Sequence, residues 1–290
     1  MIGTGHRSTW ELGGEVHPAL SMLPRTMTQP SARTSLLTAS LAGLLSLACT
    51  APHAAKHSEA CVPHPHWAYE GEAGPEHWGT LDPAFFAAKE GVAQSPIDLQ
   101  TARAFEARLP ALQFTSAPVP LEVLNNGHTV QVNCAPGNSL RFGDQSYGLA
   151  QFHFHSPSEH TLDGEHAPLE MHMVHKDANG HLAVVGVLIR QGSANGNFDA
   201  LWQNLPVEEA AAHTVAGASI DPGALLPAER GYFWYDGSLT TPPCSEGVRW
   251  FVLQRPLEMS AEQLAKFQQI FNGNNRPVQP LNARLVLRAP

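Results

Sequence analysis

Short segments in which apolar and polar residues alternate recur along the chain and predict a mainly β protein. A period of two is the pattern of a strand that buries one face. This pattern occurs at 151–155 and 169–175, and the largely apolar segments 182–189 and 248–253 are further strand candidates. Residues 121–134 predict two more strands, joined at Asn125-Asn126-Gly127, which is a typical hairpin turn sequence.

Only the segment 260–271 has the spacing of an amphipathic helix. Ser260 and Gln263 predict a capping box at its start. Its apolar face would consist of Leu264, Phe267 and Phe271. Because no internal repeat or linker-like break interrupts the pattern, residues 61–290 are predicted to form one domain.

The first 60 residues predict a leader and a tether. Arg25 and Arg33 precede an apolar stretch, 36–49, that ends in small residues, as in a secretory signal. This stretch is short for a membrane span, so export is favoured over the alternatives of a membrane anchor or an amphipathic helix. The mature protein is therefore predicted to be periplasmic or lipid-anchored to the cell envelope.

The leader allows more than one start and more than one form of processing. Met22 and Met27 lie closer to the apolar stretch than the first residue does, so either is a candidate initiator. Cleavage after Ala51 gives a simple secreted form. The sequence before Cys49 also resembles a lipoprotein cleavage box, which would place a lipid on that cysteine.

The amino-acid composition limits which ligands the chain is expected to bind. The chain has 290 residues, with 17 Lys and Arg against 26 Asp and Glu, and its net charge of −9 argues against nucleic-acid binding. Histidine is the unusual residue: there are 16, and histidine is a common metal ligand. The histidines of the Ala- and Pro-rich tether are interpreted as part of a solvated linker in preference to a weak metal site; they are His53, His57, His64 and His66.

Two predicted strands carry histidines on matching faces. His153 and His155 are two residues apart and share a face, because side chains alternate along a strand. On the segment 169–175, His172 shares a face with Glu170, so that two paired strands would bring three imidazoles together. Three neutral histidines with one open position are typical of catalytic zinc. A His-x-His pair alone is also common as surface decoration, so the spacing by itself leaves both interpretations open.

The sequence resembles the alpha-class carbonic anhydrases of the bacterial exported type. The segments that carry the resemblance, in chain order, are 66–71, 74–78, 94–98, 125–128, 151–155, 158–161, 170–175, 237–243 and 275–281. This resemblance implies a large central twisted, mostly antiparallel β-sheet with short peripheral helices. It also implies a cone-shaped cleft with the metal at its base.

By this resemblance, one Zn²⁺ per chain would be bound by His153, His155 and His172. The family uses Nε2 of the first two imidazoles and Nδ1 of the third. Outer acceptors would hold the rings in the ligating tautomer. In the same order, these acceptors would be Gln151, the backbone carbonyl of Asn274, and Glu170.

The resemblance implies reversible hydration of carbon dioxide to bicarbonate and a proton, by attack of zinc-bound hydroxide. Thr240 would accept a hydrogen bond from the hydroxide and donate one to Glu159, for which a structural ion pair is the alternative role. His128 would carry the proton out, the alternative being an exposed turn histidine without a role.

The resemblance also implies an apolar substrate pocket, because carbon dioxide offers no strong hydrogen-bonding group. The positions that match are Val174, Val184, Leu239, Val248 and Trp250, with Thr241 at the cleft near bicarbonate and inhibitors. Asn126 and Gln131 match hydrophilic positions that order water. Sulfonamides and small anions are expected inhibitors, and the sequence leaves the oligomeric state open.

The cysteines depart from the family pattern. Exported relatives commonly pair a cysteine near position 88 with one at Cys244, but this chain has Ala88. Cys61 therefore has two candidate partners, Cys244 and Cys134.

Two other functions are compatible with parts of the sequence: a binding module of the same fold without activity, and a periplasmic zinc-storage or zinc-delivery protein.

Overall fold

The computed structural model describes residues 66–290, which fall within the predicted domain 61–290. The leader and tether at 1–60, the processing sites at Cys49 and Ala51, and both pairings predicted for Cys61 lie outside the described residues. Among the described residues, Cys134 and Cys244 are both free thiols. No helix in this part of the chain combines the length and apolarity needed to cross a membrane.

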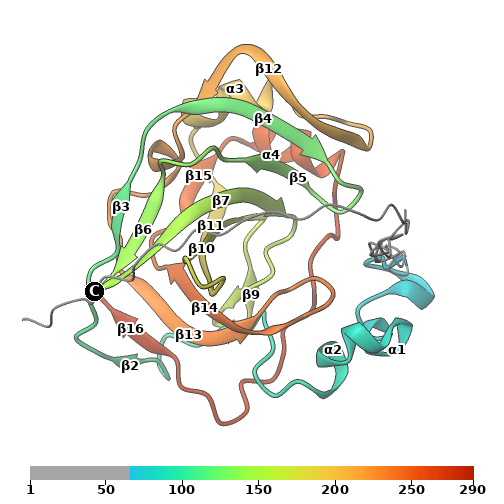
Figure 1. Cartoon of the computed structure of the whole chain (residues 1–290), viewed down its shortest axis with the longest axis vertical. Helices are drawn as coiled ribbons and strands as arrows, with labels where there is room; N and C mark the ends of the chain where they lie inside the picture. Colours follow the sequence, from blue (N-terminus) through green and yellow to red (C-terminus); the bar gives the residue numbers. More distant parts are fainter. Residues whose placement is uncertain (1–65) are drawn as a thin grey trace, which may run out of the picture. The chain divides into compact units, whose positions relative to one another are not determined.

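The described structure contains sixteen strands, which outnumber and outweigh its short helices (Figure 1). Their bounds are β1 (Asp98–Leu99), β2 (Phe105–Glu106), β3 (Gln113–Thr115), β4 (Val119–Asn125), β5 (Val130–Asn133), β6 (Ser139–Phe142), β7 (Gln145–His155), β8 (Thr161–Leu162), β9 (Glu165–His166), β10 (Leu169–Lys176), β11 (Leu182–Gln191), β12 (Ala210–Ile220), β13 (Tyr232–Ser238), β14 (Glu246–Leu253), β15 (Leu257–Met259) and β16 (Leu287–Ala289).

Thirteen of these strands make one large sheet. Its main path runs β12–β4–β5–β7–β10–β11–β14–β13–β16–β2, while β3, β6 and β15 pair beside it. A small separate sheet has the order β1–β8–β9. Most pairs are antiparallel; the parallel pairs are β1–β8, β11–β14, β11–β15 and β16–β2. The predicted fold class is confirmed.

Short helices lie at the periphery. They are α1 (Trp78–Leu81), α2 (Ala87–Glu90), α3 (Asp199–Trp202) and α4 (Ala261–Gln268), with 3₁₀ turns at Gly71–Ala73, Pro83–Phe85, Gly196–Phe198 and Pro222–Leu225. The predicted capping box of α4 is confirmed: the Ser260 side chain accepts from the backbone N–H of Gln263, and the Gln263 side chain accepts from the backbone N–H of Ser260. The other three helices have four residues each, too short for a periodic signal.

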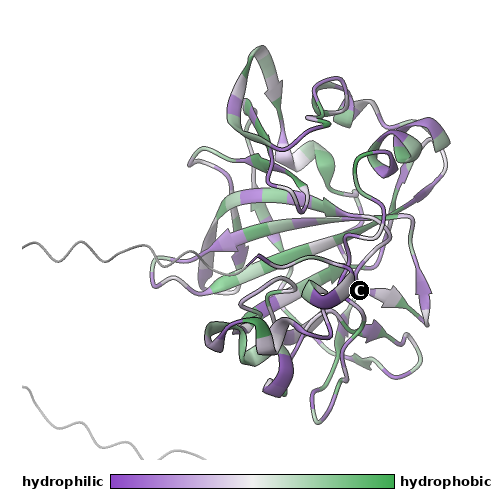
Figure 2. Ribbon diagram, turned by 90° about the vertical axis from the view of Figure 1, so that its right-hand side faces the viewer, coloured by the Kyte–Doolittle hydropathy of each residue, from purple (hydrophilic) through white to green (hydrophobic). Residues whose placement is uncertain are grey.

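The alternation that predicted the strands divides the sheet into two faces, and hydrophobic and hydrophilic residues alternate along the central strands (Figure 2). Phe152 and Phe154 of β7 and Met171 of β10 are fully buried in the larger of two apolar clusters. The opposite face carries Gln151 and His153 on β7, and here we call it the cleft face. A smaller apolar cluster, built around β11, β13 and β14, packs on the cleft-face side.

Register places the cleft-face side chains in rows across the sheet. One row runs Leu124–Gln131–His153–His172–Gly186–Val252 over β4, β5, β7, β10, β11 and β14. The next row runs Glu122–Asn133–Gln151–Val174–Val184–Trp250 over the same strands. The second row changes from polar to apolar between β7 and β10, and the first row changes one strand later, between His172 on β10 and Gly186 on β11.

Candidate metal centre and active site

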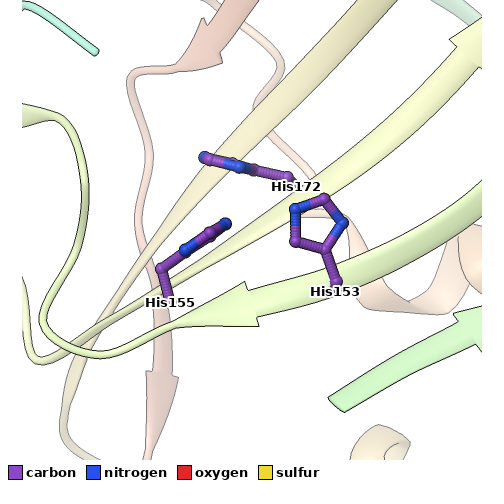
Figure 3. Close-up of side chains that lie close together, drawn as sticks. All are labelled: His153, His155 and His172. Carbon is purple, nitrogen blue, oxygen red and sulfur yellow. The ribbon is translucent and has the colours of Figure 1, made fainter. Parts of the chain in front are cut away.

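Three imidazoles meet on the cleft face at the boundary between β7 and β10 (Figure 3). His153 and His172 are direct cross-strand partners, and His155, two residues further along β7, pairs with Glu170. Each of the three histidines can offer one ring nitrogen, and these nitrogens all lie within 4.8 Å of one another. His155 and His172 are each 1% exposed, so the group is closed off from bulk solvent on most sides.

The other ring nitrogen of each imidazole faces an oxygen acceptor. His153 Nδ1 lies 2.8 Å from Gln151 Oε1, and His155 Nδ1 lies 2.7 Å from the carbonyl oxygen of Asn274. His172 Nε2 lies 2.9 Å from Glu170 Oε1. These contacts leave Nε2 of His153, Nε2 of His155 and Nδ1 of His172 free to coordinate. The His155 Nε2 atom is buried without a hydrogen-bond partner, which fits a site built for a cation.

The electrostatics of the three rings also suit metal binding. Burial, together with the neighbouring imidazoles, holds the pKa of His153 well below 6.5, and burial likewise lowers the pKa of His155. Both are therefore neutral and able to coordinate near pH 7. Burial also opposes the charge on His172, but the Glu170 carboxylate outweighs it and raises the pKa of His172. A metal at this site competes with that proton.

Glu170 is the anchor of the outer hydrogen bonds. Burial alone would raise its pKa, but the charges and hydrogen bonds of His160 and His172 hold the pKa of Glu170 well below 4.5. Its Oε2 accepts from the backbone N–H groups of Glu159 and His160, both at 2.9 Å. A carboxylate with these donors stays ionised and in place, so it fixes the His172 ring.

His160 belongs to this network and was missed in the sequence. Its Nδ1 lies 2.7 Å from Glu170 Oε1, and its Nε2 lies 2.7 Å from the hydroxyl of Tyr235. Tyr235 in turn bonds Ser95, 140 positions away in the chain. The segment 158–161, which contains His160, carries part of the family resemblance, but no local pattern connects it with β13.

Glu159 and Thr240 are both buried, and Glu159 lies beside the imidazoles. Glu159 Oε1 accepts from the backbone N–H of Arg276 at 2.9 Å, while its Oε2 is buried without a partner. That free oxygen lies 3.8 Å from His172 Nδ1. Among residues 66–290 no donor reaches Glu159 Oε2, so this oxygen is available for the hydrogen bond from Thr240 that the resemblance implies.

His128 lies in the turn between β4 and β5, where the Asn126 side chain accepts from the backbone N–H of His128. Gly127 has a φ of +80°, which glycine adopts without strain. The His128 ring stacks on Trp67, with centroids 3.6 Å apart. Burial and the nearby His66 lower the pKa of His128, while Glu209 opposes them.

Asn274 links this turn to the metal centre. Its side-chain Nδ2 donates to the carbonyl of His128 and to that of Phe154, at 2.9 and 3.0 Å. Its own carbonyl accepts from His155, as described above. A single residue therefore holds the His128 turn and one imidazole in a common frame.

The predicted substrate residues gather on the apolar side of the imidazoles. Val184, Val248 and Trp250 are core members of the smaller apolar cluster, and Val174 and Leu239 pack against it. The Trp250 ring centroid lies 4.8 Å from that of His172. Thr241 is half-buried, and the adjacent Pro242 and Pro243 line a cavity of about 380 Å³ with His66, Trp67 and His128.

Comparison with known proteins identifies this arrangement. A family model described as eukaryotic-type carbonic anhydrase matches residues 73–290. The chain belongs to the alpha carbonic anhydrase family. The carbonic anhydrase of Pectobacterium carotovorum is 44% identical over 223 residues, which are 77% of this chain and 90% of that protein. That of Neisseria gonorrhoeae is 41% identical over 249 residues, 85% of this chain and 96% of the relative.

A solved structure agrees with both the family and the fold. The alpha-carbonic anhydrase of Thermovibrio ammonificans, in complex with the inhibitor sulfanilamide, has a TM-score of 0.74 and 47% identity. The match covers 77% of this chain and 98% of that one. The predicted family and enzyme class are thus confirmed. Carbonic anhydrases hydrate carbon dioxide, and alpha-class members depend on zinc, for which this chain has the histidine triad.

Proposed function

We propose that the chain catalyses zinc-dependent, reversible hydration of carbon dioxide to bicarbonate and a proton. The supporting observation is the cluster of His153, His155 and His172, of which the first is half-buried and the other two are buried. Their outer nitrogens face oxygen acceptors and their inner nitrogens converge. Three histidines leave one of four tetrahedral positions open for water, as a catalytic site requires. A closed structural site would need a fourth protein ligand.

When bound there, zinc supplies Lewis-acid chemistry that lowers the pKa of water to about 7 and makes a hydroxide nucleophile available at neutral pH. The role of Thr240 is to orient that nucleophile. The free Glu159 Oε2 can only accept, so a hydroxyl proton of Thr240 directed at it leaves the Thr240 oxygen as an acceptor for the nucleophile. Thr240 would thus orient the nucleophile without occupying a coordination position of the metal.

Carbon dioxide would bind over the smaller apolar cluster. Val184 and Trp250 are at most 2% exposed and sit in register across β11 and β14, beside the His172 ring. An apolar wall suits a substrate without a charge or a strong hydrogen-bonding group, and it leaves charged bicarbonate poorly solvated. Product release is favoured for the same reason.

His128 would accept the proton that each turnover produces. It is half-buried, its turn is tied by Asn274 to the same frame as His155, and its ring borders an open cavity. Because its pKa is lowered from 6.5, its neutral form, which takes up a proton, predominates at pH 7. Release from the cavity edge to buffer then completes the cycle.

The direct test is stopped-flow hydration of carbon dioxide by the purified protein, combined with zinc analysis. We expect one zinc per chain, rapid hydration, loss of activity after chelation and recovery with zinc. A zinc-loaded protein without activity would favour zinc storage, and a zinc-free, inactive one would favour a binding module. Because a relative binds sulfanilamide, we also expect sulfonamides and small anions to inhibit this chain.

We also propose export to the periplasm or the envelope, on the basis of the leader at 1–60. Fractionation of cells that express the full chain should place the protein outside the cytoplasm. Labelling with a radioactive fatty acid separates a lipidated Cys49 from simple cleavage after Ala51. Retention of an unprocessed, unlabelled chain in the cytoplasm would contradict the proposal.

A further inference from the structure

Three polar side chains of β4 and β5 form a hydrogen-bonded chain on the cleft face. Gln131 Nε2 donates to Asn133 Oδ1 at 2.8 Å, and Asn133 Nδ2 donates to Glu122 Oε1 at 2.7 Å. All three side chains are half-buried. We call them the Glu122 chain.

The position of this chain connects it with the active site. Gln131 is the direct cross-strand partner of His153, and it follows His128 by three residues along the same hairpin. Asn133 is likewise the partner of Gln151, which holds His153. The Glu122 chain therefore forms a polar wall beside the metal ligands, with Gln131 at the end nearer the His128 turn and with Asn133 and Glu122 further from it.

The Glu122 carboxylate determines how the amide groups of Asn133 and Gln131 are oriented. An ionised carboxylate only accepts hydrogen bonds, whereas an amide can turn either its oxygen or its NH₂ group toward a neighbour. Glu122 therefore requires the NH₂ group of Asn133, which turns the Asn133 oxygen toward Gln131. Gln131 must then offer its NH₂ group to Asn133 and direct its own oxygen elsewhere. Among residues 66–290 no donor contacts Gln131 Oε1, so this oxygen is free for water or ligands.

We propose that Glu122 and Asn133 are positioning residues that hold the Gln131 amide with its oxygen toward the cleft. The wall beside His153 then presents an acceptor of fixed orientation. A water that donates to this oxygen has its remaining O–H bond and lone pairs directed at its neighbours, which aligns the water between the metal and His128. This inference rests on the proposed function, because aligned water matters only if a proton must leave.

The first test removes the fixed orientation of the amide groups in the Glu122 chain without removing the hydrogen bonds between them. Glu122→Gln replaces the carboxylate by an amide of the same shape, which can face Asn133 with either end. The double variant Glu122→Gln/Asn133→Asp moves the carboxylate to position 133, where both neighbouring amides must again offer NH₂. The double variant thus restores the Gln131 orientation and the net charge of the original chain. Glu106→Gln is the control, because it removes an exposed carboxylate on β2, which pairs with Arg288.

We expect Glu122→Gln to lower kcat in dilute buffer by about threefold, because proton export is slowed while the step at the metal is not. The double variant should return kcat to the original value, and the control should not change it. In all of them kcat/KM, its pH profile and the zinc content should stay constant, because a change of charge alone would shift the pH profile. Gln131→Met, which removes the acceptor itself, should reproduce the loss.

Side-chain amide NMR of ¹⁵N-labelled, metal-free protein provides a readout that does not depend on turnover. The Gln131 NH₂ signal should show one hydrogen-bonded proton in the original chain and in the double variant, and an averaged signal in Glu122→Gln. An unchanged Gln131 signal in Glu122→Gln, or a zinc-loaded double variant that keeps the slow kcat, would overturn the proposal. If no form hydrates carbon dioxide, the proposed function fails, while the amide signals still report on the Glu122 chain.

Discussion

The two faces of β10 each carry a buried histidine, and the two histidines have different partners. His172 on the cleft face and His175 on the core face are three residues apart, and each is 1% exposed. His175 Nδ1 donates to the carbonyl of Met173 on its own strand, at 2.9 Å, and burial lowers the pKa of His175 to about 4. His172 instead faces the Glu170 carboxylate, which raises its pKa, and its other nitrogen points at two more imidazoles. Burial therefore does not identify a metal ligand; the partner of the second nitrogen does.

The largest expected difference between the two histidines is in metal binding. His172→Ala should lose most bound zinc and nearly all hydration activity, because the two imidazoles of β7 alone do not complete a tetrahedral site. His175→Leu should keep one zinc per chain. Zinc content and stopped-flow rates of both purified variants check this. Full activity in a zinc-loaded His172→Ala protein, or zinc loss in a folded His175→Leu protein, would remove the distinction.

The core face should instead be sensitive to acid. The unfolded chain binds a proton at His175 near pH 6.5, whereas the folded chain resists it until about pH 4. This group thus contributes its full stabilisation above pH 6.5 and loses it progressively as the pH falls from 6.5 to 4. Between pH 7 and pH 4 the loss is about 3 kcal/mol. Urea unfolding of metal-free protein at both pH values should show this loss relative to His175→Leu; an equal pH dependence in both proteins would contradict it.

On the cleft face, Thr240→Ala should separate orientation from binding. We expect zinc to be retained and the hydration rate to fall roughly a hundredfold, about 2.7 kcal/mol, because the hydroxyl orients the nucleophile without touching the metal. Zinc analysis and kcat/KM measure the two effects independently. Loss of zinc from this variant would instead make Thr240 a structural residue.

A smaller effect is expected where β11 passes behind Glu170. A Cβ added at Gly186 would lie 2.9 Å from Glu170 Oε1 and 3.3 Å from a methyl group of Val252. Gly186→Ala should therefore displace the carboxylate that holds His172 and weaken zinc affinity about tenfold to a hundredfold. Competition with a chelator measures this affinity. Gly148→Ala, whose added Cβ would meet only the Lys176 carbonyl at 3.9 Å, is the matched control.

The smallest expected effect concerns proton export. His128→Ala should lower kcat in dilute buffer about tenfold and leave kcat/KM almost unchanged, because the step at the metal precedes export. Added imidazole should restore the rate by carrying the proton itself. Exposed His213→Ala on β12 should behave like the original chain. Persistence of the loss at high imidazole concentration would exclude His128 as the relay.

Local patterns in the sequence were sufficient for the elements that carry the metal centre. Strand-like segments in the sequence located β7, β10, β11 and β14, and alternation along β7 assigned His153 and His155 to one face. The Asn125-Asn126-Gly127 turn and the α4 capping box were also predicted. These features depend on neighbours within about four residues, so their physical causes are contained in short segments. The matching segments of the family identified the remaining candidate residues.

The tertiary structure decided what lies further apart. Asn274 reaches His155 across 119 positions, and the Tyr235–Ser95 bond spans 140. No periodic pattern encodes such pairs, because sheet order, and not sequence distance, sets which side chains meet. The direction of the Glu122 chain likewise exists only once β4 and β5 are paired in register. The residue types in the sequence supply the donors and acceptors, and the fold decides which of them face one another.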